Sequence, residues 1–164
     1  MQKRISIIIL VYNNFRFYKD CLISIFQQTY ENIEIIISDD GSENFNKKEL
    51  LEFIKDNKGK NIKKVIINEN EKNMGIVKNY NKALSLIEGD YIFYLCIDDV
   101  FYDNKVIEDC VNYFEANNYD IFTGYKDVYD ESLKKYIKTL PRKNEVNFLK
   151  ENNATKLYER LCVS

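Results

Sequence analysis

The segment Gly89-Asp-Tyr-Ile-Phe-Tyr-Leu-Cys-Ile-Asp-Asp99 is typical of a buried strand, and it ends in two adjacent carboxylates. A buried carboxylate without a partner is costly, so such a pair needs solvent, a proton or a cation. A second pair, Asp39-Asp40, follows the largely apolar residues 33–37. If the sheet is parallel, both pairs lie at its carboxyl edge, where open α/β sheets bind ligands.

Strand-like and helix-like segments alternate through the first 125 residues. Strands are expected at residues 6–11, 33–37, 65–67, 91–97 and 120–124, and helices at 15–29, 47–56, 75–88 and 104–116. This alternation predicts an α/β, Rossmann-like fold with a mostly parallel sheet flanked by helices. Residues 128–136 are expected to form one arm of an antiparallel hairpin, and residues 147–161 a polar helix. We therefore expect a core over residues 1–125 and a C-terminal hairpin and helix appendage over residues 126–164.

Composition excludes several classes of protein. The 164 residues include 24 Lys and Arg, 26 Asp and Glu, and no histidine. A net charge of -2 provides no broad basic surface, so nucleic acid is not an expected partner. Without histidine there is no Ser-His or Cys-His nucleophile and no Cys/His zinc site. The four cysteines lack C-x-x-C spacing, which indicates reduced thiols and a cytoplasmic protein.

The motifs at the predicted strand ends are suited to binding a nucleotide. Asp98 and Asp99 offer the hard oxygen ligands that Mg²⁺ and Mn²⁺ prefer, with phosphate oxygens completing the shell. Asp40 lies in an Asp-Asp-Gly-Ser turn, and its carboxylate can accept a hydrogen bond from a base or ribose. Tyr12 follows the first strand and could stack on a base. Lys78 lies one turn into a helix whose N-terminus favours phosphate.

Each motif also has an ordinary structural explanation. Asp98 would then cap the following loop, and Asp40 would belong to a common turn. Tyr12 would pack at the strand end, and Lys78 would be a solvated lysine. No single motif separates the two explanations.

The order and spacing of the motifs resemble those of the family 2 glycosyltransferases, inverting enzymes of the GT-A fold that use nucleotide-diphosphate sugars. The resemblance covers about residues 3–125. It rests on Ile7-Ile-Ile-Leu-Val-Tyr-Asn13, Gln28-Thr-Tyr-Glu-Asn-Ile-Glu-Ile-Ile-Ile-Ser-Asp-Asp-Gly-Ser42, Asn73-Met-Gly75 with Asn81-Lys-Ala83, and the segment from Gly89 to Asp99.

The resemblance implies roles for particular residues and ligands. Tyr12 is expected to stack on the base and Asp40 to hydrogen-bond it. Asp98 and Asp99 are expected to serve the diphosphate and a divalent metal ion, Mn²⁺ or Mg²⁺, with Asp99 the direct ligand. The remaining expected donor-binding residues are Val11, Asn13, Gly75 and Lys78. The favoured donor is a UDP-sugar, and the expected acceptor is a glycan or a lipid-linked molecule.

Three residues depart from the family pattern. Leu10 stands where proline is usual, Tyr80 where arginine is common, and Cys96 where the first carboxylate of an Asp-x-Asp-Asp block is expected. The family's general base is an Asp or Glu downstream of this block. No residue is assigned to that role, and the following are candidates only by default: Glu145, Glu151 and Glu159.

Other functions remain open from the sequence. The chain could be a non-catalytic or truncated module that binds a sugar nucleotide without a general base. A sugar nucleotidyltransferase would require a glycine-rich basic loop after the first strand, and a receiver domain an acidic pair there; this chain has Tyr12-Asn13. The resemblance implies the donor-binding part of a longer transferase, acting at the cytoplasmic face of a membrane. Peripheral membrane contact and the oligomeric state stay open.

Overall fold

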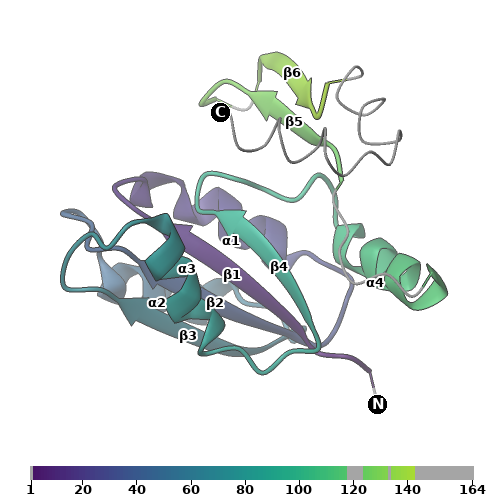
Figure 1. Ribbon diagram of the computed structural model, residues 1–164, viewed down its shortest axis with the longest axis horizontal. Helices are drawn as coiled ribbons and strands as arrows, with labels where there is room; N and C mark the ends of the chain where they lie inside the picture. The colour runs from purple at the N-terminus through teal and green to yellow at the C-terminus, as the bar shows by residue number, and fades with distance from the viewer. Residues whose placement is uncertain (1, 118–123, 133, 143–164) are drawn as a thin grey trace, which may run out of the picture. The chain divides into compact units, whose positions relative to one another are not determined.

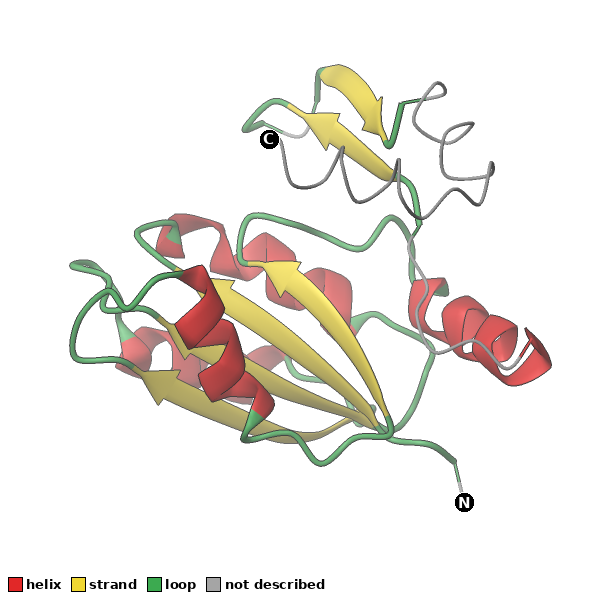
Figure 2. Ribbon diagram, in the orientation of Figure 1, coloured by secondary structure: helices red, strands yellow, loops and turns green. Residues whose placement is uncertain are grey.

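The computed structural model describes residues 2–117, 124–132 and 134–142. The chain forms two compact units, Met1–Asn118 and Tyr119–Ser164. The first unit is a parallel sheet with helices on both faces, and the second contains an antiparallel hairpin (Figures 1 and 2). The predicted α/β fold with a C-terminal hairpin is confirmed.

The sheet of the first unit has the strand order β3-β2-β1-β4, and all its strands are parallel. The strands are β1 (Ile5–Val11), β2 (Ile33–Asp39), β3 (Ile62–Glu69) and β4 (Tyr91–Cys96). The two central strands, β1 and β2, are buried along their whole length. Their continuous β-branched runs suit strands that are covered on both faces. Because the strands are parallel, their carboxyl ends meet at one edge of the sheet (Figure 2).

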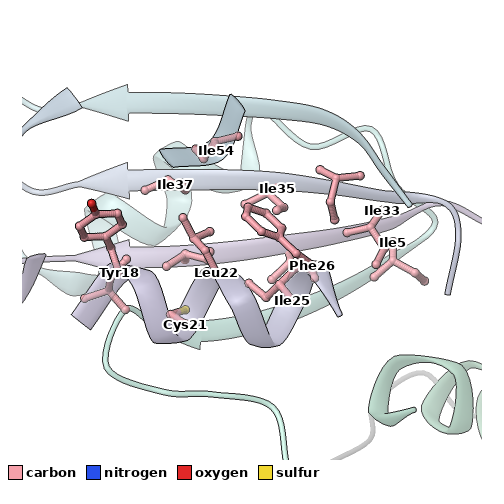
Figure 3. Packing of buried hydrophobic residues seen from close by; sticks show 14 of the residues in the cluster. Ile5, Tyr18, Cys21, Leu22, Ile25, Phe26, Ile33, Ile35, Ile37 and Ile54 are labelled. Carbon is pink, nitrogen blue, oxygen red and sulfur yellow. The ribbon is translucent and has the colours of Figure 1, made fainter. Parts of the chain in front are cut away.

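Helices cover the two faces of the sheet unequally. The helical elements are η1 (Phe15–Phe17), α1 (Tyr18–Phe26), α2 (Lys47–Asn57), α3 (Ile76–Leu84) and α4 (Val106–Asn117). α1 and α2 lie on one face, and α3 lies on the other (Figure 1). The first face carries the larger core, in which Leu22, Ile25 and Phe26 of α1 pack against the strands (Figure 3).

The α3 face combines a small apolar cluster with buried polar groups. Its apolar centre is formed by Ile8, Leu10, Ile36 and Ala83. At the amino edge of this face, Glu34 is buried and its Oε1 accepts hydrogen bonds from Ser6 Oγ at 2.6 Å and from the Glu88 N–H.

The helix ends differ from those predicted. The helix expected at 15–29 divides into η1 and α1 and stops at Phe26. Beyond it, the Gln28 side chain bonds Asp103 O and the Ile107 N–H, and the Thr29 N–H bonds Asn104 O instead of continuing the helix. α3 stops at Leu84 rather than Glu88, since the Ser85 hydroxyl bonds Lys82 O and closes the last turn.

Other predicted elements agree more closely or are not described. β3 is longer than predicted, because its pairing with β2 continues through polar residues. In the second unit, β5 (Lys126–Tyr129) pairs antiparallel with β6 (Tyr136–Leu140), which confirms the hairpin. The prediction of a single arm over residues 128–136 is wrong, because this range runs from the end of β5 to the start of β6. The predicted strand at 120–124 and helix at 147–161 lie wholly or almost wholly outside the described residues. Within the described part of the chain, no helix has the length and apolar character needed to cross a bilayer.

The larger core makes a direct prediction about stability. Leu22 is 0% exposed, whereas Leu51 on α2 is 48% exposed. We expect Leu22→Ala to lower the free energy of unfolding by about 2–5 kcal/mol, through lost burial and a cavity. Leu51→Ala is the matched control and should change it by about 0.5 kcal/mol or less. Denaturant titrations measure both, and equal losses would contradict the observed core.

Candidate functional site

The two aspartate pairs lie on opposite sides of the end of β1. The Asp40 N–H donates to Val11 O at 2.9 Å, and the Ile97 N–H donates to Leu10 O at 3.1 Å. Because β1 lies between β2 and β4, the two pairs are separated by two strand spacings, or about 10 Å. The side chain of Val11 is buried in the core, so this residue contributes its backbone to the edge.

Tyr12 and Asn13 form the turn that leaves β1. Asn13 has φ +56°, a left-handed conformation that asparagine tolerates better than most residues. Its N–H donates to Ser42 Oγ at 2.9 Å, and its Oδ1 accepts from the Glu43 N–H at 3.2 Å. Asn13 therefore ties the end of β1 to the turn after β2. The Tyr12 side chain is 48% exposed at this edge.

Asp39 builds the turn after β2. Its carboxylate accepts from the N–H groups of Gly41 and Ser42, each at 3.0 Å, and from the Ser42 hydroxyl. The residue is 3% exposed. Its oxygens therefore serve the local backbone, in the way that aspartate often stabilises a turn.

Asp40 holds the loop that leads into α3. Its Oδ1 accepts from the Met74 N–H at 2.9 Å and from Asn70 Nδ2 at 3.1 Å, and its Oδ2 accepts from the Gly75 N–H at 2.9 Å. The carboxylate is buried, with the residue 4% exposed. These bonds bring two predicted site residues, Asp40 and Gly75, into direct contact. The expected contact of Asp40 with a base stays a prediction.

Two glycines allow this loop to lie close to the β2 turn. Gly41 has φ +75°, and a Cβ there would lie 2.7 Å from the backbone of Lys72. Gly75 has φ +87°, but a Cβ there would meet nothing within 4 Å. Gly41 is thus required by close approach as well as conformation, whereas Gly75 is required by conformation.

Asp98 and Asp99 differ from the first pair in their exposure. Asp98 is exposed and makes no hydrogen bond or ion pair with other described residues, and Asp99 is half-buried. The Asp99 N–H donates to Cys96 O at 3.0 Å, which turns the chain at the end of β4. Beneath them, burial and then the charges of Asp99 and Asp98 raise the pKa of the Cys21 thiol. That thiol is therefore neutral at physiological pH.

The carboxylate pair fits a metal ion that also binds phosphate. No group of three or more His, Cys, Asp or Glu side chains within the described ranges could hold a metal. Asp98 and Asp99 can provide two hard oxygen ligands, and Mg²⁺ commonly completes such a shell with phosphate and water. Cys96 is a soft ligand, and its Sγ lies 3.2 Å from Tyr94 OH. The residues present therefore suit an open site rather than a closed metal cage.

The positions of the other predicted site residues do not assign them a role. Lys78 is exposed on α3, and its side chain makes no hydrogen bond or ion pair with any described residue. The Tyr80 ring packs edge-to-face against Tyr94, with ring centroids 5.5 Å apart. The default candidates for a general base lie outside the described residues: Glu145, Glu151 and Glu159.

Sequence reasoning missed the buried amides behind Asp40. Asn79 of α3 is 1% exposed and bonds to Ser38 of β2. Asn70 joins Asn79 to Asp40. The available signal was Asn79 itself, a polar residue four positions before Ala83 on the face of α3 that packs on the sheet.

A family model described as glycosyl transferase family 2 matches residues 6–163. The chain belongs to this family. A relative, glycosyltransferase GlyG of Streptococcus pneumoniae, is 31% identical over 134 residues, which are 80% of this chain and 42% of GlyG. An uncharacterized glycosyltransferase of Haemophilus influenzae is 32% identical over 115 residues, covering 70% of this chain and 34% of the relative. The chain thus spans less than half the length of these relatives.

Two solved structures have a similar fold. TarS 1–349 of S. aureus in complex with UDP-GlcNAc aligns with a TM-score of 0.59 at 23% identity, over 70% of this chain and 32% of that chain. The mannosyltransferase PcManGT of Pyrobaculum calidifontis, in complex with GDP-Man and Mn²⁺, aligns with a TM-score of 0.62 at 17% identity, over 80% and 38% of the two chains. These matches confirm the GT-A fold predicted from the sequence.

The two glycines of the site should respond differently to alanine. At both positions the positive φ should cost about 1–3 kcal/mol once a Cβ is present. Gly41→Ala should lose more, because its Cβ also collides with backbone atoms of Lys72. Gly75→Ala is the matched control with open space around the new methyl group. Free energies of unfolding test this order, and a larger loss for Gly75→Ala would contradict it.

Proposed function

We propose that this chain binds a nucleotide-diphosphate sugar at the carboxyl edge of its sheet, as the donor-binding part of an inverting glycosyltransferase. The observation that carries the proposal is the division between the two aspartate pairs. Asp39 and Asp40 are buried and build the edge, whereas Asp98 is exposed and Asp99 half-buried beside it. Membership of family 2 supports the same assignment.

In this proposal the base lies on the β2 side of β1 and the diphosphate on the β4 side. The exposed ring of Tyr12 offers a stacking surface for the base. Asp40 orders the neighbouring loop and retains lone pairs for a further hydrogen bond, because each carboxylate oxygen can accept more than one. The spacing of about 10 Å between the β2 and β4 ends suits a ligand that extends across β1.

The diphosphate would be held by groups at the end of β4 and the start of α3. Asp98 and Asp99 would bind Mn²⁺ or Mg²⁺, which when bound supplies charge neutralisation for the leaving diphosphate. Gly75 is the N-cap of α3, and its own N–H is taken by Asp40, so a phosphate would meet the other free N–H groups of the first turn, with Lys78 adding a positive charge. Two similar structures support this chemistry, since TarS was solved with UDP-GlcNAc and PcManGT with GDP-Man and Mn²⁺.

Transfer to an acceptor requires a general base positioned on the opposite side of the sugar from the leaving group. The described residues contain no side chain that we assign to this role. We therefore propose that residues 1–125 bind the donor and that residues 126–164 begin an acceptor-binding half. The proposed acceptor is a glycan or lipid-linked molecule at the cytoplasmic face of a membrane. The alternative is a module that binds the donor without catalysing transfer. A chain that binds the donor but transfers the sugar slowly or not at all would favour this alternative.

Nucleotide binding tests the proposal directly. In calorimetric titrations with UDP, GDP and dTDP, we expect one nucleotide, UDP in the first instance, to bind. Its affinity should fall when Mn²⁺ is omitted, because the diphosphate charge is then opposed by Asp98 and Asp99. Absence of binding by all three nucleotides with Mn²⁺ present would overturn the proposal.

Variants of Asp98 and Asp99 test whether the effect of Mn²⁺ arises at the end of β4. Asp98→Asn and Asp99→Asn should reduce the effect of Mn²⁺, and Asp98→Asn should leave the melting temperature nearly unchanged because Asp98 has no described partner. Asp56→Asn is a suitable control, since Asp56 is exposed near the end of α2, away from the carboxyl edge. An equal effect of the control variant would place the metal elsewhere.

The stacking role of Tyr12 gives a separate prediction. Tyr12→Ala should weaken nucleotide binding by about 1–3 kcal/mol, the usual contribution of an aromatic side chain stacked on a base. Tyr12→Phe keeps the ring and is the matched control, so it should bind nearly as tightly as the unaltered chain. The same calorimetric titration measures both variants. Unchanged binding by Tyr12→Ala would remove Tyr12 from the site.

A further inference from the structure

We propose that Asn79 is a positioning residue for the donor site, although its side chain is buried between α3 and β2. It would act through Asn70 and Asp40 on the loop at residues 70–75. This inference rests on the proposed function, because the property that it controls is the affinity for the nucleotide.

The Asn79 side chain joins α3 to β2. Asn79 Oδ1 accepts from Ser38 Oγ at 2.6 Å, and Asn79 Nδ2 donates to Ser38 O at 2.9 Å. One side chain thus bonds both the hydroxyl and the carbonyl of a single residue near the end of β2. Such paired bonds are directional, so they fix the helix along the strand more precisely than apolar contacts do.

Asn70 connects Asn79 to the loop at residues 70–75. Asn70 Nδ2 donates to Asn79 Oδ1 at 2.9 Å and to Asp40 Oδ1 at 3.1 Å. Asn70 is itself held, because its N–H donates to Asp39 O and its Oδ1 accepts from Asn68 Nδ2 at 3.1 Å. Asp40 in turn accepts from the amides of the loop. A continuous series of hydrogen bonds therefore joins α3 to the residues beside the proposed ligand.

The Asn79 amide lies in a largely apolar environment. Its neighbours on this face include Ile8, Leu10, Ile36 and Ala83, so water has little access to its amide. Removing the amide would leave the Ser38 hydroxyl and an Asn70 N–H without their partners, which is costly in a buried site. Asn70 would keep its bonds to Asp39, Asn68 and Asp40 but would lose the one that ties it to α3. The group that orients Asp40 Oδ1 would then be held less firmly.

A buried network can also serve stability without influencing the site, and the chain offers a control for that case. Ser6, on the same face of the sheet, bonds Glu34 at 2.6 Å and accepts from the Gly89 N–H at 2.9 Å. Glu34 precedes Ser38 on β2 by four residues, or about 13 Å along the strand. The Ser6 network is therefore comparable in burial but lies at the amino edge.

The experiment compares Asn79→Ala with Ser6→Ala in two measurements. The first is hydrogen exchange of the Met74 and Gly75 amides without ligand, and the second is nucleotide affinity at a temperature where both variants are folded. Asn79→Ala should speed exchange at these two amides and weaken binding about 3- to 30-fold, the range for mutations along a coupling network. Ser6→Ala should do neither, although it lowers the melting temperature.

Asn70→Ala removes the hydrogen bonds between Asn79 and Asp40 without altering α3. If Asn79→Ala does not fold, Asn70→Ala tests the proposal in the same two measurements. If both fold, the double variant should bind about as weakly as the weaker single variant, because both changes interrupt one series of bonds. Unchanged affinity and exchange in Asn79→Ala, or equal losses in Ser6→Ala, would overturn the proposal. Failure of the unaltered chain to bind any nucleotide would instead overturn the proposed function, while the exchange measurement still reports on the loop.

Discussion

The buried carboxylate of Asp40 is the group around which the carboxyl edge is organised. Without partners, a carboxylate with this little exposure would be strongly unfavourable. Two amides of the loop before α3 and the Asn70 side chain provide those partners. The loop in turn gains an anchor at the helix N-terminus, where free N–H groups favour a negative charge. The end of β2 and the start of α3 therefore stabilise each other.

This arrangement gives the four edge aspartates two different tasks. Asp39 and Asp40 accept hydrogen bonds from backbone groups and shape the surface. Asp98 lies in solvent beside Asp99, where a cation and phosphate could reach it. The pairs look equivalent in the sequence, since each follows an apolar strand. Their environments differ because a loop packs over the end of β2, as the close approach of Lys72 to Gly41 shows.

The sequence predicted the elements whose pattern is local and missed those that depend on distant partners. β1 and β2 are nearly continuous β-branched runs, so their existence and parallel pairing were predictable. The polar end of β3 was not, because its residues are held by pairing with β2 rather than by burial. The position of Asp40 at a strand end was foreseen, but its partner Asn70 lies 30 residues away. No spacing rule connects two such positions.

The two departures near the end of β4 occur in one connected group. The Tyr80 ring packs on Tyr94, and the Tyr94 hydroxyl lies 3.2 Å from Cys96 Sγ. Where the family pattern has an arginine and a carboxylate, this chain has a phenol and a thiol, so one charge of each sign is absent. Burial and the contact with Cys96 raise the pKa of the Tyr94 hydroxyl, so the Tyr94 side chain is also neutral. With neither an arginine at position 80 nor a carboxylate at position 96, the acidic groups that close β4 are Asp98 and Asp99.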